Sequence, residues 1–338
     1  MLARLPVGRL VAGGVVLLAG ALFLLWIVPS PDYLYVPNAA KPLDGRVKVE
    51  GGREPGGPGD IYYVDVTVRR ATWLEHVLAF ARPEGATLVS SAQVVPRGSS
   101  FAEQRKQELA EMDRSEQVAA AVALRRAGYD VVTRLTGVLV EAVAQDAPAA
   151  RVLRDGDLIV SVDGTPVLRA RELRTRIGRH EPGDVVSLGI RRAGSVRTVA
   201  VRTVHDPADP RRPVIGIRVA QGASVRLPIS VSIDLGGVGG PSAGLPFALD
   251  VLEQLGHDVD HGLKVAATGE LDLDGSVGPI GGVKQKTIGA RRAGVDVFLV
   301  PAGENANEAR RYARGLRVVA VESFQQALRA LATLGARA

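Results

Sequence analysis

The sequence contains no cysteine and very little histidine. Its 338 residues include five histidines, and these are His76, His180, His205, His257 and His261. The absence of cysteine excludes disulfide frameworks, zinc–thiolate sites, iron–sulfur clusters and cysteine nucleophiles. No two histidines form the HExxH pair of a zincin-type metalloprotease. We therefore expect no metal site and no cofactor.

Lysine and aromatic residues are also scarce. Only six of the 42 basic residues are lysines, aromatic residues make up 4% of the chain, and the net charge of +6 is spread out with no run of five like charges. Nucleic-acid-binding surfaces usually gather basic residues on one face, often with aromatics between them, so nucleic acid is not an expected partner. Arginine stays protonated, so among the basic side chains only histidine and the few lysines could act as bases near neutral pH.

The longest apolar run covers residues 10–28, LVAGGVVLLAGALFLLWIV, and carries no charge. At about 1.5 Å of rise per residue, its length matches the roughly 30 Å core of a bilayer. A cleaved signal peptide is the alternative, but its apolar region is shorter and ends in a small-residue cleavage site. We favour a single uncleaved transmembrane helix. Because Arg4 and Arg9 precede it, the positive-inside rule predicts a cytoplasmic tail at 1–9 and an extracellular body on the cell membrane.

The rest of the chain divides into three parts by pattern. Residues 29–128 hold Pro- and Gly-rich stretches, a strand pattern over 61–70 and a helical pattern over about 101–127, and we expect a juxtamembrane spacer. Residues 129–204 have the short alternating runs of a compact β-rich module. Residues 205–338 alternate between strand and helix patterns, which is typical of an α/β or α+β domain.

The β-rich module contains the segment APAARVLRDGDLIVSVDGTPV, with Gly156 before a strand and Asp163-Gly164 as a two-residue hairpin turn. This segment resembles a PDZ domain of the bacterial protease-associated type. The resemblance implies that a peptide, usually a C terminus, is bound by strand addition. The residues that match the binding loop and the strand after it are Leu135, Thr136, Gly137, Val138, Leu139 and Val140. Threonine replaces the first glycine of that loop, and a plain β module without a ligand is the alternative.

A glycine-rich stretch, GGVGGPSAG at 236–244, lies between a strand pattern and a helical pattern. A phosphate-binding loop would need a lysine where Pro241 stands, and a dinucleotide-binding loop would need a third glycine, so both are disfavoured. A serine at such a turn can be a nucleophile, because glycines let a substrate backbone approach and N–H groups at a helix start can bind an oxyanion. Ser242 is therefore the candidate nucleophile, and a simple helix cap is the alternative.

A serine nucleophile needs a base, and here lysine is the candidate. Burial among apolar neighbours would lower its pKa from about 10.4 toward neutrality. Two of the six lysines, Lys284 and Lys286, lie in one short motif, GGVKQK at 281–286. Two residues apart on a helix, they point about 200° apart, so only one of them can face Ser242.

The blocks GPSAG (240–244), ATGELDLDGSVGPIGGVKQK (267–286) and AGVDVFLVP (293–301) resemble the proteolytic domain of the Lon protease family. The resemblance covers about 205–338 and implies a serine endopeptidase with a serine–lysine dyad that cleaves protein or peptide substrates. In that family the serine is the one in G-P-S-A-G, which is Ser242. The lysine is the one in G-G-h-x-x-K, which is Lys286.

Other residues of these blocks take supporting roles by the same resemblance. Thr268 matches a threonine whose hydroxyl orients the lysine amine, and Glu270 matches the acid of that block. Gly240 and Pro241 match the turn before the serine. Lon enzymes commonly carry an acidic residue three positions before the serine, where this chain has Gly239.

The order of the parts resembles the membrane-anchored, ATP-independent PDZ–Lon proteins of Gram-positive bacteria, because no ATPase module precedes the proteolytic domain. We therefore expect a multidomain protein with a transmembrane helix at 10–28, a PDZ domain at 129–204 that selects or gates substrates, and a Lon-type domain at 205–338. Lon-type domains form rings, so the resemblance also implies a homo-oligomeric ring such as a hexamer. A catalytically silent or latent scaffold that binds peptide C termini is the alternative function.

Overall fold

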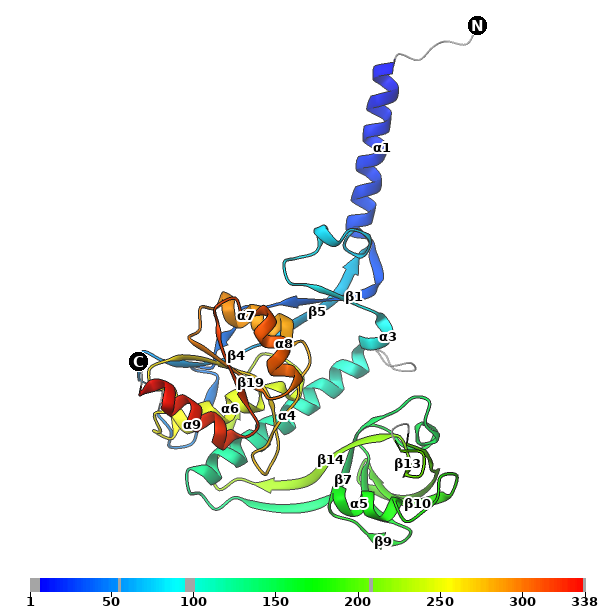
Figure 1. Ribbon diagram of the computed structural model, residues 1–338, viewed down its shortest axis with the longest axis vertical. Helices are drawn as coiled ribbons and strands as arrows, with labels where there is room; N and C mark the ends of the chain where they lie inside the picture. Colours follow the sequence, from blue (N-terminus) through cyan, green and yellow to red (C-terminus); the bar gives the residue numbers. More distant parts are fainter. Residues whose placement is uncertain (1–6, 54–55, 95–100, 207–208, 337–338) are drawn as a thin grey trace. The chain divides into compact units, whose positions relative to one another are not determined.

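The computed structural model describes residues 7–53, 56–94, 101–206 and 209–336 (Figure 1). The chain forms two compact units, and the second is inserted in the first: residues 1–130 and 227–338 make one unit, and Val131–Arg226 make the other. This division differs from the expected boundaries. Residues 29–128, expected to be a spacer, fold together with the C-terminal part of the chain, and residues 205–226 fold with the β-rich module.

The first unit is built on a sheet whose strand order is β2, β4, β16, β19, β20. β2 (Lys41–Pro42) is antiparallel to β4, and β4 (Asp60–Tyr63), β16 (Lys264–Ala267), β19 (Val297–Pro301) and β20 (Arg317–Val321) are mutually parallel. β4 thus comes from the expected spacer and pairs with a strand about 200 residues later. The strand expected over 61–70 is in fact two, because the chain leaves this sheet after Tyr63 and starts β5 (Val66–Thr72) in another.

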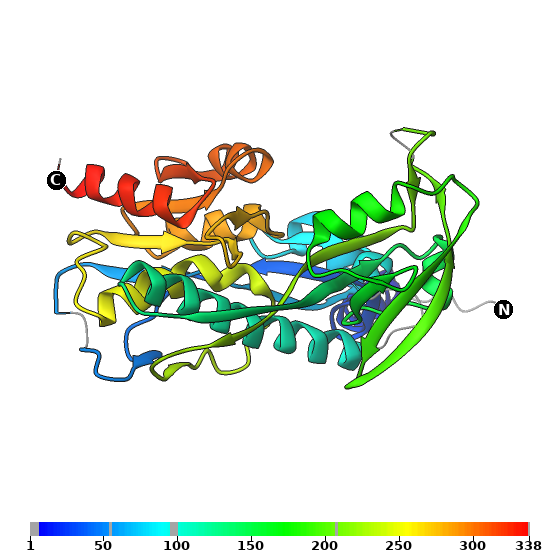
Figure 2. The same cartoon turned by 90° about the horizontal axis from the view of Figure 1, so that it is seen from below.

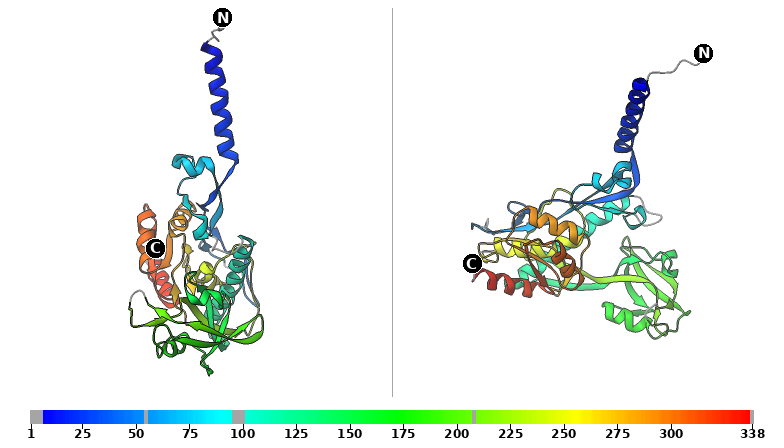
Figure 3. Two further views of the ribbon diagram at one scale, coloured as in Figure 1. Left: turned by 90° about the vertical axis from the view of Figure 1, so that its right-hand side faces the viewer. Right: turned by 45° about the horizontal axis from the view of Figure 1, so that its top comes forward.

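Helices cover both faces of this sheet, as Figure 3 shows from two sides. On one face, Ala266, Phe298 and Val300 pack against α7 (Val283–Arg292) and α8 (Glu304–Tyr312). The alternate residues of β16 and β19 face a second core, formed with α4 (Phe101–Arg126), α6 (Gly244–Gln254) and α9 (Phe324–Gly335). Such two-sided burial is typical of parallel strands and explains their continuous apolar sequence.

The long helix α4 lies beside α6, as seen from below in Figure 2. Its buried side is lined by small residues, Ala119, Ala120 and Ala123, which let the two helices approach closely. α6 is buried on almost all sides, in agreement with its largely apolar sequence. α4 is therefore part of the core that supports the start of α6.

Short strands and helices complete the first unit. β1 (Pro29–Pro37) pairs with β5 and with β6 (Thr87–Val89), β3 (Val47–Val49) pairs with β15 (Val231–Ile233), and β17 (Glu270–Leu271) pairs with β18 (Val277–Gly278). The remaining short elements are α2 (Trp73–Val77), η1 (Ala79–Ala81), α3 (Ser91–Val94) and η3 (Pro241–Ala243).

Helix α1 (Val7–Ile27) precedes β1, and its side chains are described from Ala12 onward. Across the described part of the chain, no helix is both long and apolar enough to cross a membrane.

The second unit is a sheet in the order β11, β10, β8, β7, β14, with β9 paired to β8. Its strands are β7 (Val132–Val143), β8 (Leu158–Val162), β9 (Thr165–Pro166), β10 (Val185–Arg192), β11 (Ser195–Arg202) and β14 (Ile217–Arg226), with α5 (Ala170–Ile177), η2 (Pro148–Arg151) and the pair β12 (Val204–His205) and β13 (Pro213–Val214). The expected two-residue turn is confirmed, because Val162 pairs with Thr165 and both Asp163 and Gly164 have positive φ.

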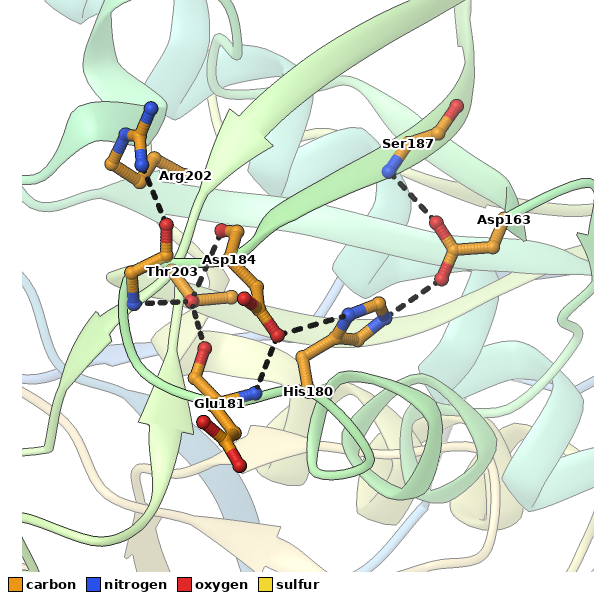
Figure 4. A network of polar contacts seen from close by, with 8 residues as sticks. Asp163, His180, Glu181, Asp184, Ser187, Arg202 and Thr203 are labelled. Atoms are coloured by element: carbon orange, nitrogen blue, oxygen red, sulfur yellow. Dashed lines mark hydrogen bonds and ion pairs between the residues drawn. The ribbon is translucent and has the colours of Figure 1, made fainter.

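A polar network fixes the turn between α5 and β10 (Figure 4). One carboxylate oxygen of Asp163 accepts the Ser187 N–H at 2.9 Å, and the other lies 2.8 Å from Nε2 of His180. Asp184 accepts the Glu181 N–H at 2.8 Å, and the Thr203 hydroxyl donates to the Glu181 carbonyl at 2.8 Å. These contacts give the polar residues of this turn a structural role.

Candidate active site

Two segments meet at the carboxyl edge of the parallel sheet. Thr268 directly follows β16, and its N–H donates to Leu299 O at 3.0 Å. Ser242 lies in η3, at the start of α6. The two are joined at the Ser242 carbonyl, which accepts the Thr268 hydroxyl at 3.1 Å and the Gly269 N–H at 2.8 Å. The half-buried Ser242 hydroxyl is thus carried on a turn that is fastened to the end of β16.

Lys286 reaches this turn from α7. Its Nζ lies 2.7 Å from Ser242 Oγ and 3.3 Å from Thr268 Oγ1, and the residue is only 5% exposed. Burial lowers the pKa of the Lys286 amine from 10.5 to about 7, although the carboxylate of Asp65 acts in the opposite direction. A large fraction of the amine is therefore neutral at physiological pH, which is the form that can accept a proton from the serine hydroxyl.

Lys284, the other lysine of the motif, points elsewhere. Its Nζ donates to Thr87 Oγ1 at 3.1 Å and lies 5.6 Å from the centre of the Tyr312 ring. The separation follows from helix geometry, since residues two apart project to opposite sides. The structure therefore brings Lys286, and not Lys284, to Ser242.

The turn before Ser242 is held by α4, a contact that the sequence analysis missed. Gly240 donates its N–H to Glu108 O at 2.9 Å, and Ser115 donates its hydroxyl to Pro241 O at 3.0 Å. Gly240 has a φ of 93°, which glycine adopts without strain. The helical pattern of α4 was visible in the sequence, but no local signal could name the distant turn that it contacts.

The structure also places the other site residues expected from the sequence. Glu270 begins β17, where it pairs with Gly278.

Asp65 is a further residue near the site that the sequence did not indicate. It lies two positions after β4, and its side chain is 13% exposed. Its Oδ2 forms an ion pair with Lys41 at 3.2 Å. Its Oδ1 is buried and has no hydrogen-bond partner.

The peptide-binding assignment needs correction. Residues 135–140 lie inside β7, not in a loop, and β7 is hydrogen-bonded to β14 along its length and to β8 at Val138 and Leu139. Strand addition needs an open edge, so these two residues cannot accept a peptide in this way. Among the described strands of this sheet, the edges are β11 and β14.

The boundary expected at residue 204 left β14 outside the β-rich module. In the structure β14 belongs to it, because it pairs with β7 over ten residues. Gly137 nevertheless has a structural reason to be glycine. Its φ is 142°, and a Cβ there would stand 2.5 Å from Ile159 O. The glycine thus allows β8 to approach β7 closely.

One acidic group lies apart from the serine–lysine pair. Glu253, Asp258 and Asp260 each bring a carboxylate oxygen to within 4.8 Å of the other two. Burial raises the pKa of Glu253 to about 7 and also raises that of Asp260. Glu253 accepts the N–H groups of Val259 and Asp260 at 2.6 and 2.7 Å, so its carboxylate already fixes the loop after α6.

Comparison with known families gives two matches along the chain. Residues 220–333 match the Lon protease (S16) C-terminal proteolytic domain, and residues 105–203 match the PDZ domain. The first match contains Ser242, Thr268 and Lys286. The second starts within α4 of the first unit and ends before β14.

Individual relatives cover parts of the chain. "Lon protease 2" of Herpetosiphon aurantiacus is 39% identical over 111 residues, which are 30% of this chain and 13% of that protein. "Lon protease 2" of Bacillus subtilis is 34% identical over 104 residues, 31% of this chain and 18% of that protein. A "Probable periplasmic serine endoprotease DegP-like" of Pseudomonas fulva is 40% identical over 74 residues, which are 22% of this chain and 15% of that protein.

A solved structure is similar to part of the chain as well. The PDZ domain of the SdrC-like protein from Listeria monocytogenes is 30% identical, with a TM-score of 0.24, and the match covers 26% of this chain and 93% of that domain. With the serine–lysine pair at the carboxyl edge of the sheet, the family matches give one conclusion: the chain carries a PDZ domain and a Lon-type (S16) C-terminal proteolytic domain, which is a serine peptidase domain.

Proposed function

We propose that this protein is a serine endopeptidase with a Ser242–Lys286 dyad. The observation that carries the proposal is the 2.7 Å contact between Lys286 Nζ and Ser242 Oγ, made by a buried amine whose pKa is lowered to about 7. A solvent-facing lysine would be almost fully protonated at neutral pH and could not act as a base. Here burial supplies the neutral amine that the reaction needs.

In the proposed reaction, Ser242 Oγ forms a bond to the scissile carbonyl carbon while neutral Lys286 takes the hydroxyl proton. The resulting ammonium gives this proton to the leaving amine as the peptide C–N bond breaks. Water then attacks the acyl-enzyme, and Lys286 takes a proton from the water and returns it to Ser242 Oγ as the ester bond breaks. The amides of Gly240, Gly244 and Leu245 already donate to Glu108, Pro241 and Gly269, respectively. The backbone amides of Ser242 and Ala243 are therefore the candidates for holding the oxyanion.

The test is cleavage of casein or a fluorogenic peptide by the full chain and three variants. Ser242→Ala and Lys286→Ala should lose activity, whereas Lys284→Ala should keep it. Equal losses in the two lysine variants would overturn the assignment of Lys286 as the base. If the wild type cleaves nothing and reacts with no serine-directed probe, but still binds C-terminal peptides, the protein is a scaffold and not a protease.

We also propose that the PDZ domain selects substrates and gates the dyad. The support is its position in the chain. It is inserted after α4, which holds the turn before Ser242, and the chain returns from it to β15, which ends seven residues before Gly240. We expect a bound peptide to act on the nucleophile turn through α4 and β15, the elements on either side of the inserted domain.

The peptide site proposed here is the edge strand β14, near α5. Gln221 of β14 donates from Nε2 to the carbonyl of Leu168 at 2.6 Å, which links this strand to the start of α5. Titration of the isotope-labelled protein with a C-terminal peptide should shift the amide resonances of residues 217–221. Shifts centred on Leu139 and Val140 of β7 instead would contradict the proposal.

We propose, from the uncharged sequence of residues 10–28 and the two arginines before it, that the chain is anchored in the cell membrane with its body outside. Trp73 and Val77 of α2 and Phe80 of η1 also expose apolar side chains, and α2 begins close to the end of α1, where the Trp73 N–H donates to Val28 O at 3.0 Å. Aromatic residues favour the membrane interface. Release of the protein from membranes by alkaline washing, without detergent, would contradict the anchor.

The ring assembly implied by the family resemblance remains part of the proposal. Light scattering of the detergent-solubilised chain would give its subunit number, and a strictly monomeric active protein would contradict a ring.

A further inference from the structure

Asp65 stands at the same edge of the sheet as the dyad but comes from a segment outside the matched proteolytic domain. β4 and β16 are parallel, with Tyr63 opposite Ala267, so the residues that follow them, Asp65 and Thr268, emerge at one edge. The residue after Asp65, Val66, packs against Gly282, where a Cβ would stand 3.1 Å from the valine side chain. Asp65 is thus held beside the start of the helix that carries Lys286.

The surroundings of Asp65 are asymmetric. Oδ2 is paired with Lys41, whose side chain is 44% exposed, at 3.2 Å. Oδ1 is buried and lacks a hydrogen-bond partner. A buried carboxylate oxygen without a partner is costly, so a nearby positive charge is the natural compensation.

The Ser242 and Thr268 hydroxyls contact the Lys286 amine directly, and the Asp65 carboxylate acts on it through its field, which favours the ammonium form. Lys41 from β2 partly neutralises Asp65, and Lys284 on α7 is turned toward Thr87. Burial of Lys286 and the field of Asp65 therefore act in opposite directions.

We propose that Asp65, with Lys41 as its counter-ion, is a positioning residue that stabilises the Lys286 ammonium and so sets the pH at which the dyad becomes active. The ammonium forms when Lys286 takes the proton of Ser242, and a fixed carboxylate nearby lowers the free energy of that charged state. The inference rests on the proposed serine–lysine chemistry and adds to it a charge pair from residues 41 and 65.

The two members of the pair should have opposite effects. Asp65→Asn removes the negative field, so the Lys286 amine should lose its proton at lower pH; a nearby opposite charge typically shifts a pKa by about one unit or more. Lys41→Met leaves the negative charge of Asp65 less neutralised, so Lys286 should hold its proton to higher pH. This second shift should be smaller, on the order of a few tenths of a unit, because Lys41 is half exposed to solvent.

The experiment is an NMR titration of the full chain with 13C-labelled lysine, in which six lysine signals are expected and Lys286→Gln identifies the one of interest. The pH dependence of kcat/KM is measured on the same variants. Lys264→Met, which removes a lysine charge at the opposite end of β16, is the matched control and should move neither midpoint.

The proposal is supported if the Lys286 titration midpoint falls in Asp65→Asn and rises in Lys41→Met, with the acid limb of activity following it. Unchanged midpoints in both variants would overturn it, even if activity drops, because a purely structural role would lower the rate at every pH. Should Asp65→Asn fail to fold, the upward shift in Lys41→Met decides the matter. If the wild type has no activity but the Lys286 midpoint still shifts in the two variants, the endopeptidase function is rejected and the charge coupling is retained.

Discussion

Gly239 packs against Glu108 so closely that a Cβ at position 239 would stand 2.9 Å from the Cβ of Glu108 and 3.3 Å from its carbonyl carbon. This contact gives a physical reason for the glycine where Lon enzymes commonly carry an acidic residue. Contact with α4 leaves no room for a side chain there. The glycine is thus consistent with an ordered nucleophile turn.

Gly239→Asp should therefore destabilise the protein and reduce its activity, although it restores the residue type common in the family. Overpacking of this kind costs about 1–3 kcal/mol, and the turn that bears Ser242 must shift to accept the side chain. Thermal unfolding and peptide cleavage measure the two effects. Gly56→Asp is the control, because a Cβ there meets nothing within 4 Å. An active and equally stable Gly239→Asp variant would show that α4 does not constrain the turn.

Lys286→Met should stabilise the fold while abolishing activity. The pKa of Lys286 is about 7 in the folded protein and near 10.5 when unfolded. Below pH 7 the amine is charged in both states, and folding carries the full free-energy cost of burying that charge. Between pH 7 and 10.5 the unfolded state binds one more proton than the folded state, so the free energy of unfolding of the wild type rises with pH. At roughly 1.4 kcal/mol per pKa unit, the gain from methionine should be a few kcal/mol at pH 6.

This gain should shrink as the pH rises toward 10.5, which thermal unfolding of both proteins at pH 6 and pH 9 would show. A stability difference that is the same at the two pH values would mean that Lys286 titrates normally in the folded protein.

Thr268→Val should lower kcat about tenfold or more. The variant loses two hydrogen bonds, and each contributes a net free energy of about 1 kcal/mol. The Thr268 hydroxyl donates to Ser242 O and accepts from Lys286 Nζ, so its loss releases both members of the dyad. Steady-state kinetics with a short peptide measure the effect. Thr268→Ser keeps the hydroxyl and should retain most of the activity, and equal losses in both variants would point to packing by the methyl group.

Ser115→Ala should reduce kcat with little change in KM for a short peptide. Its hydroxyl is the group by which α4 holds the carbonyl of Pro241, the residue before Ser242. Loss of a buried hydrogen bond costs about 1–3 kcal/mol when the partner is left unsatisfied. Ser115→Thr, which retains a hydroxyl, is the comparison. A change confined to KM would instead place Ser115 in substrate binding.

Much of the local structure could be predicted, because it depends on short-range patterns. The helix at 101–126, the Asp163-Gly164 turn and the helix bearing Lys286 follow from periodicity, turn residues and the positions of glycines. Boundaries between units could not be predicted in this way. β4 and β14 each complete a sheet with partners distant in sequence, and nothing in their own residues names those partners.

The sequence alone singled out the residues of the candidate site, because cysteine, histidine and lysine are scarce and the motifs around Ser242 and Lys286 resemble those of the Lon family. Helix periodicity further showed that only one of the two neighbouring lysines could face the serine. Burial, however, is a property of the whole fold: the low pKa of Lys286, the contact of α4 with the Ser242 turn and the nearness of Asp65 all arise from packing between distant segments. The tertiary structure alone therefore decided the charge state of the base and which parts of the chain hold it in place.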